Sequence, residues 1–396
     1  MYACSRRKWL KTAAAAAGVA FTEPLIRRAG AAPTQPVAVA KCMDYGPELV
    51  PTLDRMFDQL GGLGRLVKGK TVAMKINLTG APSYRVGYLP CEDTHYTHPK
   101  VIAATVHLMS KAGARRIRLL ESPWSTADAI EEYIYQANWE PRDILRAGED
   151  VAFENTNFLG NAKNYARMKV PFGGYMFPAF DLIHAYQDCD VFVSIAKMKE
   201  HATAGITLSM KNCFGITPAT IYGSGAGIDE PSIAPKGGRS IVHSGYRQPS
   251  KSAPSELHPD SPREDTWRVP RTIVDLVSAR PIDLAIVEGI RTMTGGEGPW
   301  IQEPLTGVNP GVIVAGTNCV NTDAVCMSIM GFDPMADRGT PPFERCDSTL
   351  KLAEAAGLGT RDLSKIEVAG TPIHQVRFDF ASIRRERRAA MHRRPA

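Results

Sequence analysis

The sequence lacks the short cysteine motifs that hold common redox cofactors. No two of its cysteines are arranged as C-x-x-C, so neither a ferredoxin-type iron–sulphur cluster nor a structural zinc knuckle is encoded locally. The motif C-x-x-C-H is also absent, which excludes a c-type haem attachment site. No G-x-S-x-G elbow follows a predicted strand, which disfavours a serine hydrolase of the α/β-hydrolase type.

The eight cysteines that are present are scattered along the chain. The first, Cys4, lies in an N-terminal segment that we expect to be removed. The remaining seven are an odd number at irregular spacing, which predicts no particular disulfide. Because cysteine behaves in a core as a small apolar residue, we expect most of these seven to be buried.

The excess of positive over negative charge is concentrated at the two ends of the chain. The 47 basic and 41 acidic residues give a net charge of +6, and arginines gather in SRRK near the start and IRRERRAAMHRRPA at the finish. A nucleic-acid-binding protein needs a basic face on its folded body, so the near-neutral middle argues against one. We interpret residues 381–396 as a basic C-terminal tail, which is either a solvated end or a segment that docks to an acidic partner or anionic lipid.

Residues 1–31 resemble a twin-arginine export signal. The letters SRRKWL precede a weakly apolar run of about ten residues, too short to span a bilayer, and AGA at 29–31 fits a cleavage site. The resemblance implies recognition by the twin-arginine export machinery and a periplasmic chain that begins near Ala32. Such a chain would not be an integral membrane protein, and it could carry a cofactor loaded before export. The alternative is an uncleaved, apolar N-terminal helix.

From residue 37 onward, short β-branched runs alternate with helical patterns, which is typical of βαβ units. The predicted strands are 37–42, 71–77, 116–121, 191–196, 282–289 and 311–316. The predicted helices are 48–60, 99–112, 126–137, 271–279, 320–330 and 348–356. We therefore predict an α/β domain over 32–380, with a mainly parallel sheet or sheets flanked by helices, built as one body or as two lobes with a cleft between them.

Residues 222–268 break this alternation. They are rich in Gly, Pro and Ser and are too long for an ordinary connection. We interpret them as an insertion that forms a lid or a surface flap.

Polar residues stand at the carboxyl ends of four predicted strands, namely Lys75 with Asn77, Glu121, Lys197 with Lys199, and Glu288. In open sheets of this kind, ligands bind beyond the carboxyl ends of the strands. These residues therefore predict a cleft for a small anionic ligand, held by lysines and positioned by hydrogen bonds. The alternative is a set of solvated strand ends that form a few salt bridges.

The segment THP at 97–99 looks like the start of a helix. Thr97 is the candidate N-cap, and Pro99 suits the first turn. His98 would then lie at the positive end of the helix, near Lys75.

The stretch KMKEHATAGITLSMKNCFG at 197–215 places cationic side chains in an apolar context. Lys211 stands between Met210 and Phe214 and should be partly desolvated, which lowers the pKa of an amine and can make it a base, a nucleophile or a covalent attachment point. His201 could carry protons or bind a metal ion, although a buried, hydrogen-bonded histidine is the alternative.

The segment TGGEGPW at 294–300 is a further candidate for the site. Its glycines permit close approach of the backbone to a ligand, and Glu297 could point into the cleft. Alternatively, residues 294–300 form a surface turn that takes no part in the site.

At these residues the chain resembles the family known as domain of unknown function 362, from about residue 37 to 370. The resemblance rests on KIN at 75–77, THP at 97–99, KMKEH at 197–201, TLSMKNCFG at 207–215, and GTNCVNTDAVCMSIMGFDP, which contains Asp323. Some members carry added iron–sulphur domains, but this chain lacks a cysteine cluster. The chemistry of the family is not established, so this resemblance implies no particular reaction.

The same region also resembles the nickel-pincer lactate racemase family. That family has a histidine, Ala-Gly, a hydroxyl residue and then a lysine that holds the cofactor covalently, and His201, Ala204-Gly205, Thr207 and Lys211 have the same spacing here. The letters LSM replace the glycine-rich turn of that family. The resemblance implies a cleft between two α/β lobes, with His201 near a metal or acting as acid and base, and Lys211 on the cofactor.

Two functions fit these observations. In the first, the protein is an exported enzyme of oxidoreductase or isomerase type, with a small anionic or carbonyl substrate and a metal or a covalently held organic cofactor. The catalytic residues would be Lys211, His201 and Glu121, with His201 also a tentative metal ligand, and the ligand- or cofactor-binding residues would be Lys75, Asn77, His98, Lys197, Lys199, Thr207, Asn212 and Asp323. In the second, the same cleft belongs to a periplasmic binding or electron-transfer accessory protein without turnover.

Overall fold

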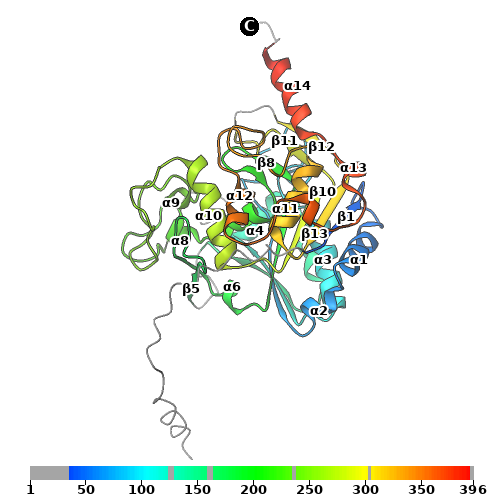
Figure 1. Ribbon diagram of the computed structural model, residues 1–396. Coiled ribbons are helices and arrows are strands. Elements are labelled where there is room, and N and C mark those ends of the chain that lie inside the picture. The colour runs from blue at the N-terminus through cyan, green and yellow to red at the C-terminus, as the bar shows by residue number, and fades with distance from the viewer. Residues whose placement is uncertain (1–34, 124–128, 158–163, 234–237, 302–304, 393–396) are drawn as a thin grey trace, which may run out of the picture. The chain divides into compact units, whose positions relative to one another are not determined.

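The computed structural model describes residues 35–123, 129–157, 164–233, 238–301 and 305–392 (Figure 1). The predicted export signal at 1–31 lies outside the described residues, as do the last four residues of the chain. The described residues from 35 onward belong to one compact unit.

Eight strands form one mixed sheet in the order β14-β1-β13-β10-β7-β2-β3-β4. Their bounds are β1 (Val37–Lys41), β2 (Thr71–Lys75), β3 (Arg116–Glu121), β4 (Val151–Asn155), β7 (Val191–Lys197), β10 (Leu284–Gly289), β13 (Val312–Gly316) and β14 (Val368–Gly370). All six strands predicted from the sequence are present, with ends shifted by no more than two residues. The two missed strands, β4 and β14, are only partly buried, so they do not show a continuous apolar run.

Most strands of this sheet share one direction. β13 runs antiparallel to both of its neighbours, β1 and β10, and the other pairs in the sheet are parallel. The predicted fold class, a mainly parallel sheet flanked by helices, is therefore confirmed. Because β10, β7, β2 and β3 are adjacent and parallel, their carboxyl ends meet at one edge.

Successive side chains of the strands face two separate cores. In β2, Val72 and Met74 pack into one core, and Ala73 packs into the other. Burial on both faces explains why the strands read as nearly continuous apolar runs. The hydrophobic effect of covering both faces, about 25 cal/mol for each Å² of apolar surface, is the main force that holds the layers together.

Helices cover both faces of the sheet. On one face lie α1 (Leu49–Gln59), α2 (Leu63–Val67), α3 (Pro99–Lys111), α4 (Ile130–Gln136) and α5 (Pro141–Leu145). On the other lie α6 (Ala185–Asp188), α7 (Ser209–Asn212), α8 (Ala219–Tyr222), α9 (Ser240–His243), α10 (Asp265–Ala279), α11 (Cys319–Ile329), α12 (Thr349–Ala355) and α13 (Ile373–Val376). In Figure 1, α1 to α3 lie to the right and α8 to α10 to the left. The six predicted helices correspond to α1, α3, α4, α10, α11 and α12.

Three short hairpins complete the described strands. They are β5 (Tyr165–Lys169) with β6 (Ala179–Ile183), β8 (Lys199–His201) with β9 (Gly205–Thr207), and β11 (Thr292–Thr294) with β12 (Thr306–Val308). The β8–β9 hairpin follows the carboxyl end of β7 and is followed by α7. The cation-rich stretch 197–215 is therefore a strand end, a hairpin and one helical turn.

Residues 64–71, GRLVKGKT, have the G-x-x-x-x-G-K-[ST] spacing of a phosphate-binding loop. Such a loop follows a strand and begins a helix. Here the order is reversed, because the segment contains the end of α2 and leads into β2. It also lies at the end of β2 opposite Lys75. We therefore assign no nucleotide site to it.

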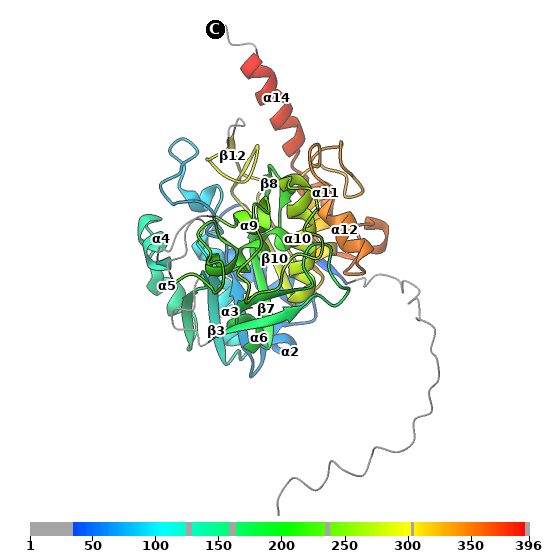
Figure 2. The ribbon, with the colours of Figure 1, turned by 90° about the vertical axis from the view of Figure 1, so that its left-hand side faces the viewer.

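The basic tail begins with a helix, α14 (Phe380–His392), which is anchored at its start. Arg384 donates a hydrogen bond to Glu200 Oε1 at 3.0 Å. The other oxygen of Glu200 accepts hydrogen bonds from Thr294 Oγ1 at 2.5 Å and Gly295 N at 2.7 Å. Beyond this contact α14 points away from the sheet in both views (Figures 1 and 2).

The seven cysteines that follow Cys4 in the sequence are all buried and unpaired. This confirms the expectation that they behave as small apolar residues. None of the described helices has the length and apolar character needed to cross a bilayer.

Candidate active site

A cavity of about 410 Å³ lies at the carboxyl ends of β2 and β3, a volume typical of small-molecule sites. Its walls also include the β8–β9 hairpin with α7, residues 238–244 and residues 297–300. Eight predicted site residues line it: Lys75, Asn77, Glu121, Lys199, His201, Thr207, Lys211 and Asn212.

Lys75 and Glu121 form a buried ion pair on the floor of the cavity. The distance from Lys75 Nζ to Glu121 Oε1 is 2.7 Å, and both side chains are about 3% exposed. Glu121 also accepts hydrogen bonds from the backbone N–H groups of Leu78 at 2.8 Å and Ser122 at 2.9 Å. Burial lowers the pKa of Lys75 and raises the pKa of Glu121, while the ion pair opposes both shifts. The charges at the ends of β2 and β3 are thus paired and buried. The alternative from the sequence, in which these strand ends are solvated, does not hold for them.

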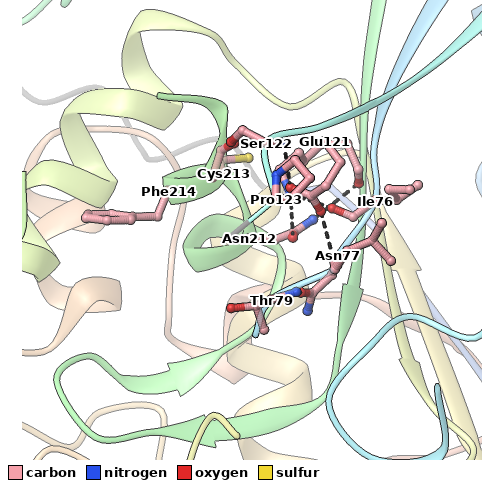
Figure 3. A network of polar contacts seen from close by, with 12 residues as sticks. Ile76, Asn77, Thr79, Glu121, Ser122, Pro123, Asn212, Cys213 and Phe214 are labelled. Carbon is pink, nitrogen blue, oxygen red and sulfur yellow. Dashed lines mark hydrogen bonds and ion pairs between the residues drawn. The ribbon is translucent and has the colours of Figure 1, made fainter. Parts of the chain in front are cut away.

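Asn212 connects this pair to the neighbouring strand β7. Its side-chain amide donates to Ser194 Oγ at 3.0 Å, and its oxygen accepts from Lys75 Nζ at 3.4 Å. Figure 3 shows Asn212, Glu121 and Ser122 gathered together, with Phe214 turned away from them. Asn77 lies beside this group, and its side-chain oxygen accepts a hydrogen bond from Thr79 N at 3.2 Å.

Asp323 fixes the position of α7 through hydrogen bonds and is not among the residues that line the cavity. Its carboxylate, on α11, accepts hydrogen bonds from Ser209 N at 2.9 Å, Ser209 Oγ at 2.6 Å and Met210 N at 3.0 Å. Burial raises the pKa of Asp323 to about 7, and these three bonds oppose the shift. Asp323 therefore positions the turn that carries Lys211, and its direct part in binding a ligand or cofactor stays a prediction.

Lys211 is the cation with the fewest contacts in the cavity. Its ammonium lies 4.5 Å from the centre of the Phe214 ring. Within the described ranges no carboxylate or carbonyl oxygen forms a hydrogen bond or ion pair with it. Burial, together with the charges of Lys75 and Arg239, lowers the pKa of Lys211 to about 8, while Glu297 opposes the shift. An amine with this pKa is present in both protonation states near neutral pH.

His201 lies in the same cavity and is neutral. Its Nδ1 accepts a hydrogen bond from Thr203 N at 3.1 Å, which places the ring proton on Nε2. Burial and the neighbouring lysines hold the pKa of His201 well below its usual range. Although Nδ1 lies 3.9 Å from Glu297 Oε2, a neutral ring forms no ion pair at that distance.

The 294–300 segment is part of the site. Glu297 accepts a hydrogen bond at its backbone carbonyl from Lys199 Nζ at 2.6 Å, and its carboxylate accepts one from Ala202 N at 2.8 Å. Lys199 is fully buried, and burial holds its pKa well below its usual value. Trp300 also lines the cavity, and the missing side chains of Gly80 and Gly298 make room for its ring.

Residues 238–244 add groups that the sequence analysis did not select. Arg239 is buried and donates to the backbone oxygens of Ser122 and Thr217 and to Asn157 Oδ1. Burial lowers the pKa of Arg239 to about 10. His243 lies against Phe214, and burial lowers its pKa. This part of the predicted insertion therefore forms a wall of the site, and its role as a lid stays a prediction.

Lys197 and His98 are not among the residues that line the cavity, so their part in ligand binding stays a prediction. Lys197 Nζ pairs with Glu288 at 2.5 Å, where neither side chain is exposed. His98, in place of the predicted Thr97, is the N-cap of α3, because its Nδ1 accepts from Lys100 N at 3.1 Å. The His98 ring stacks on Tyr45 with 3.5 Å between ring centres.

The charges that line the cavity favour an anion over a bare metal ion. Four cationic residues, Lys75, Lys199, Lys211 and Arg239, face three acidic ones, Glu121, Glu297 and Asp265, which leaves one formal positive charge. In the part of the chain that the structure describes, no three His, Cys, Asp or Glu side chains are grouped to hold a metal. A metal held by protein side chains alone does not fit this donor set. The expectation that Lys211 holds an organic cofactor covalently stays a prediction.

Relatives were found in three comparisons. The family model described as Domain of unknown function (DUF362) matches residues 72–328, which include every residue that lines the cavity. A thylakoid-associated protein of Synechocystis sp. is 23% identical over 289 residues, which cover 72% of this chain and 71% of that protein.

Two solved structures show a low similarity. The lactate racemase apoprotein from Thermoanaerobacterium thermosaccharolyticum is 12% identical with a TM-score of 0.38, over 74% of this chain and 57% of that one. A protein from Thermotoga maritima is 13% identical with a TM-score of 0.33, over 78% and 58%. The chain thus spans a little over half the length of these two structures, and a similarity this low says nothing about the site. The family match, which extends over more than half of the sequence, shows that the chain belongs to the DUF362 family.

Proposed function

We propose that the protein is an enzyme of isomerase or oxidoreductase type that binds a small organic anion in the cavity and uses Lys211 for proton transfer. The observation that supports this most directly is the unequal pairing of the cations. Lys75 is paired with a carboxylate, and Lys199 donates to a carbonyl oxygen. Lys211 has no such acceptor among the described residues, and a carboxylate ligand would supply one through a charge-assisted hydrogen bond.

The charges and hydrogen-bond partners of the other cavity residues suggest what each of them would do. Lys75 contributes positive charge, Lys199 contributes an amine donor, and Asn77, Thr207 and Asn212 offer polar groups that can orient a ligand. Glu121 keeps Lys75 in place. His201 has Nδ1 occupied by a backbone N–H, which leaves Nε2–H for a ligand oxygen or a proton relay.

Deuterium exchange tests this function. The purified protein is incubated in D₂O with pyruvate, lactate and acetate, and loss of the C–H signal beside the carboxylate or carbonyl is followed by proton NMR. We expect exchange with at least one of these anions, slowed in Lys211→Met by about 10²–10⁴-fold, the usual contribution of a positioned acid–base group. Retention of the wild-type exchange rate in a folded Lys211→Met variant would contradict the role of Lys211 in proton transfer.

Calorimetric titration of the same anions separates this enzyme from a binding or electron-transfer accessory protein. Binding together with exchange supports the enzyme. Binding of an anion without exchange at any of its C–H positions favours the accessory function instead.

We also propose that the protein is exported to the periplasm by the twin-arginine pathway. The support is the SRRKWL segment, together with a relative described as thylakoid-associated. Replacement of Arg6 and Arg7 by lysine should leave the protein in the cytoplasmic fraction, with residues 1–31 uncleaved. Periplasmic recovery of the double variant in the same amount as the wild type would contradict this.

A further inference from the structure

We infer that the ligand of the cavity is a carbonyl compound that carries a carboxylate, a small 2-oxo acid in chemical class, and that Lys211 forms an imine with its carbonyl carbon. This inference rests on the proposed function, because it names the substrate of the same site and states how Lys211 would take part in proton transfer: its imine would draw electrons from the neighbouring C–H bond and make that proton easier to remove, while the other cations of the cavity attract the ligand carboxylate. It follows from the pairing, the burial and the charge of the three lysines that line the cavity.

Of the three lysines that line the cavity, Lys211 is the one whose amine is placed to attack a bound ligand. Lys75 is occupied by Glu121, the backbone oxygen of Ile76 and Asn212, and Lys199 is fully buried with its amine against the Glu297 carbonyl. Lys211, by contrast, is partly exposed to the cavity and touches the Phe214 ring. An amine without an acceptor can turn its lone pair toward a bound carbon once it is neutral.

The cavity also keeps part of this amine neutral at physiological pH. A pKa of about 8 leaves about one amine in ten unprotonated at pH 7. The charged and titratable groups that face Lys211 are Lys75, Lys199, Arg239, Glu297, His201 and His243. The cations among them disfavour the ammonium form, and they would equally favour a carboxylate on the ligand.

The chemical step is balanced without any further reagent. The neutral amine attacks the carbonyl carbon, a C–N bond forms, and the C–O bond breaks. The two protons lost by nitrogen leave with the oxygen as water. The phenyl ring of Phe214 and the indole of Trp300 both line the cavity and add apolar surface to it.

Reductive trapping tests the inference. The purified full chain is incubated at pH 7 with pyruvate and sodium cyanoborohydride, which delivers hydride to the imine carbon and makes the C–N bond permanent. Intact mass and peptide mapping then locate the adduct. We expect one adduct for each chain, on the peptide that contains Lys211.

Three comparisons sharpen the test. Lys211→Arg keeps the charge but should lose the adduct, and Lys169→Arg, at an exposed lysine, should keep it. Butanone, a ketone like pyruvate but without a carboxylate, should label Lys211 about tenfold less, the loss expected without one charge-assisted hydrogen bond.

Some outcomes overturn the inference while leaving the proposed function standing. Calorimetric binding of pyruvate without a trapped adduct, an adduct on Lys199 or on surface lysines instead, or a Lys211 that already carries another group in the purified protein would each do so. Because mapping is done on the wild type, a variant that fails to fold does not weaken the test. Absence of both binding and adduct would count against the proposed function itself.

Discussion

Lys75→Met should lower the free energy of unfolding by about 3–5 kcal/mol, the cost of leaving one member of a buried ion pair without its partner. The substitution leaves the Glu121 carboxylate without a cationic partner. This carboxylate is about 3% exposed and, among the described residues, keeps only the backbone N–H groups of Leu78 and Ser122 as donors. Equilibrium urea denaturation followed by circular dichroism measures the change.

Two companion variants show whether burial of the charge is the cause. Lys75→Met combined with Glu121→Gln removes both charges and should recover most of the loss, since replacing a buried ion pair by neutral groups is often nearly neutral. Lys251→Met breaks an ion pair whose side chains are 76% and 75% exposed, and it should change stability by less than about 1 kcal/mol. A Lys75→Met variant as stable as Lys251→Met would show that the pair contributes nothing.

The Lys211 amine should be acetylated at pH 7 at least about tenfold faster than an exposed lysine. About one Lys211 amine in ten is neutral at this pH, against about one in 2,500 for an ordinary lysine. Part of this advantage is lost because a less basic amine is a weaker nucleophile. Trace labelling with acetic anhydride, followed by peptide mapping, gives the relative rates.

The pH dependence of this labelling has a definite sign. Because only the neutral amine reacts, the rate at Lys211 should fall about tenfold for each pH unit below 8 and level off above it. His201 and His243 have lowered pKa values and so stay neutral between pH 7 and 9. Lys169 serves as the exposed control, and a Lys211 profile that coincides with that of Lys169 would contradict the burial argument.

Much of the fold could be predicted from local patterns. The apolar runs of β2, β3, β7 and β10 marked them as strands buried on both faces, and the strand–helix alternation indicated a mainly parallel sheet. The antiparallel direction of β13 could not be predicted, because its apolar run looks the same in either direction. The helix of the C-terminal tail was missed, since its arginine-rich letters carry no apolar stripe that would indicate a core-facing surface.

The candidate site could be predicted only in part. Strand ends are readable from the sequence, so Lys75, Glu121 and Asn77 were found by their position alone. Arg239 and His243 were missed because residues 222–268 have no periodicity that would show where their side chains point. Glu297 was found only as an alternative, through its glycine neighbours. Thr97 was predicted as the N-cap of α3 from the letters THP, but the N-cap lies one residue later, at His98.

The sequence by itself determined which segments form buried strands and that four of them carry charge at their carboxyl ends, because these features depend on neighbours within a few residues. Only the tertiary structure decided which charges neutralise one another. The order of the strands sets Lys75 beside Glu121 and Lys197 beside Glu288. The same folding leaves Lys211 in the cavity with its ammonium 4.5 Å from the centre of the Phe214 ring. Pairing of charges is decided by distances between residues far apart in the chain, and no local pattern contains those distances.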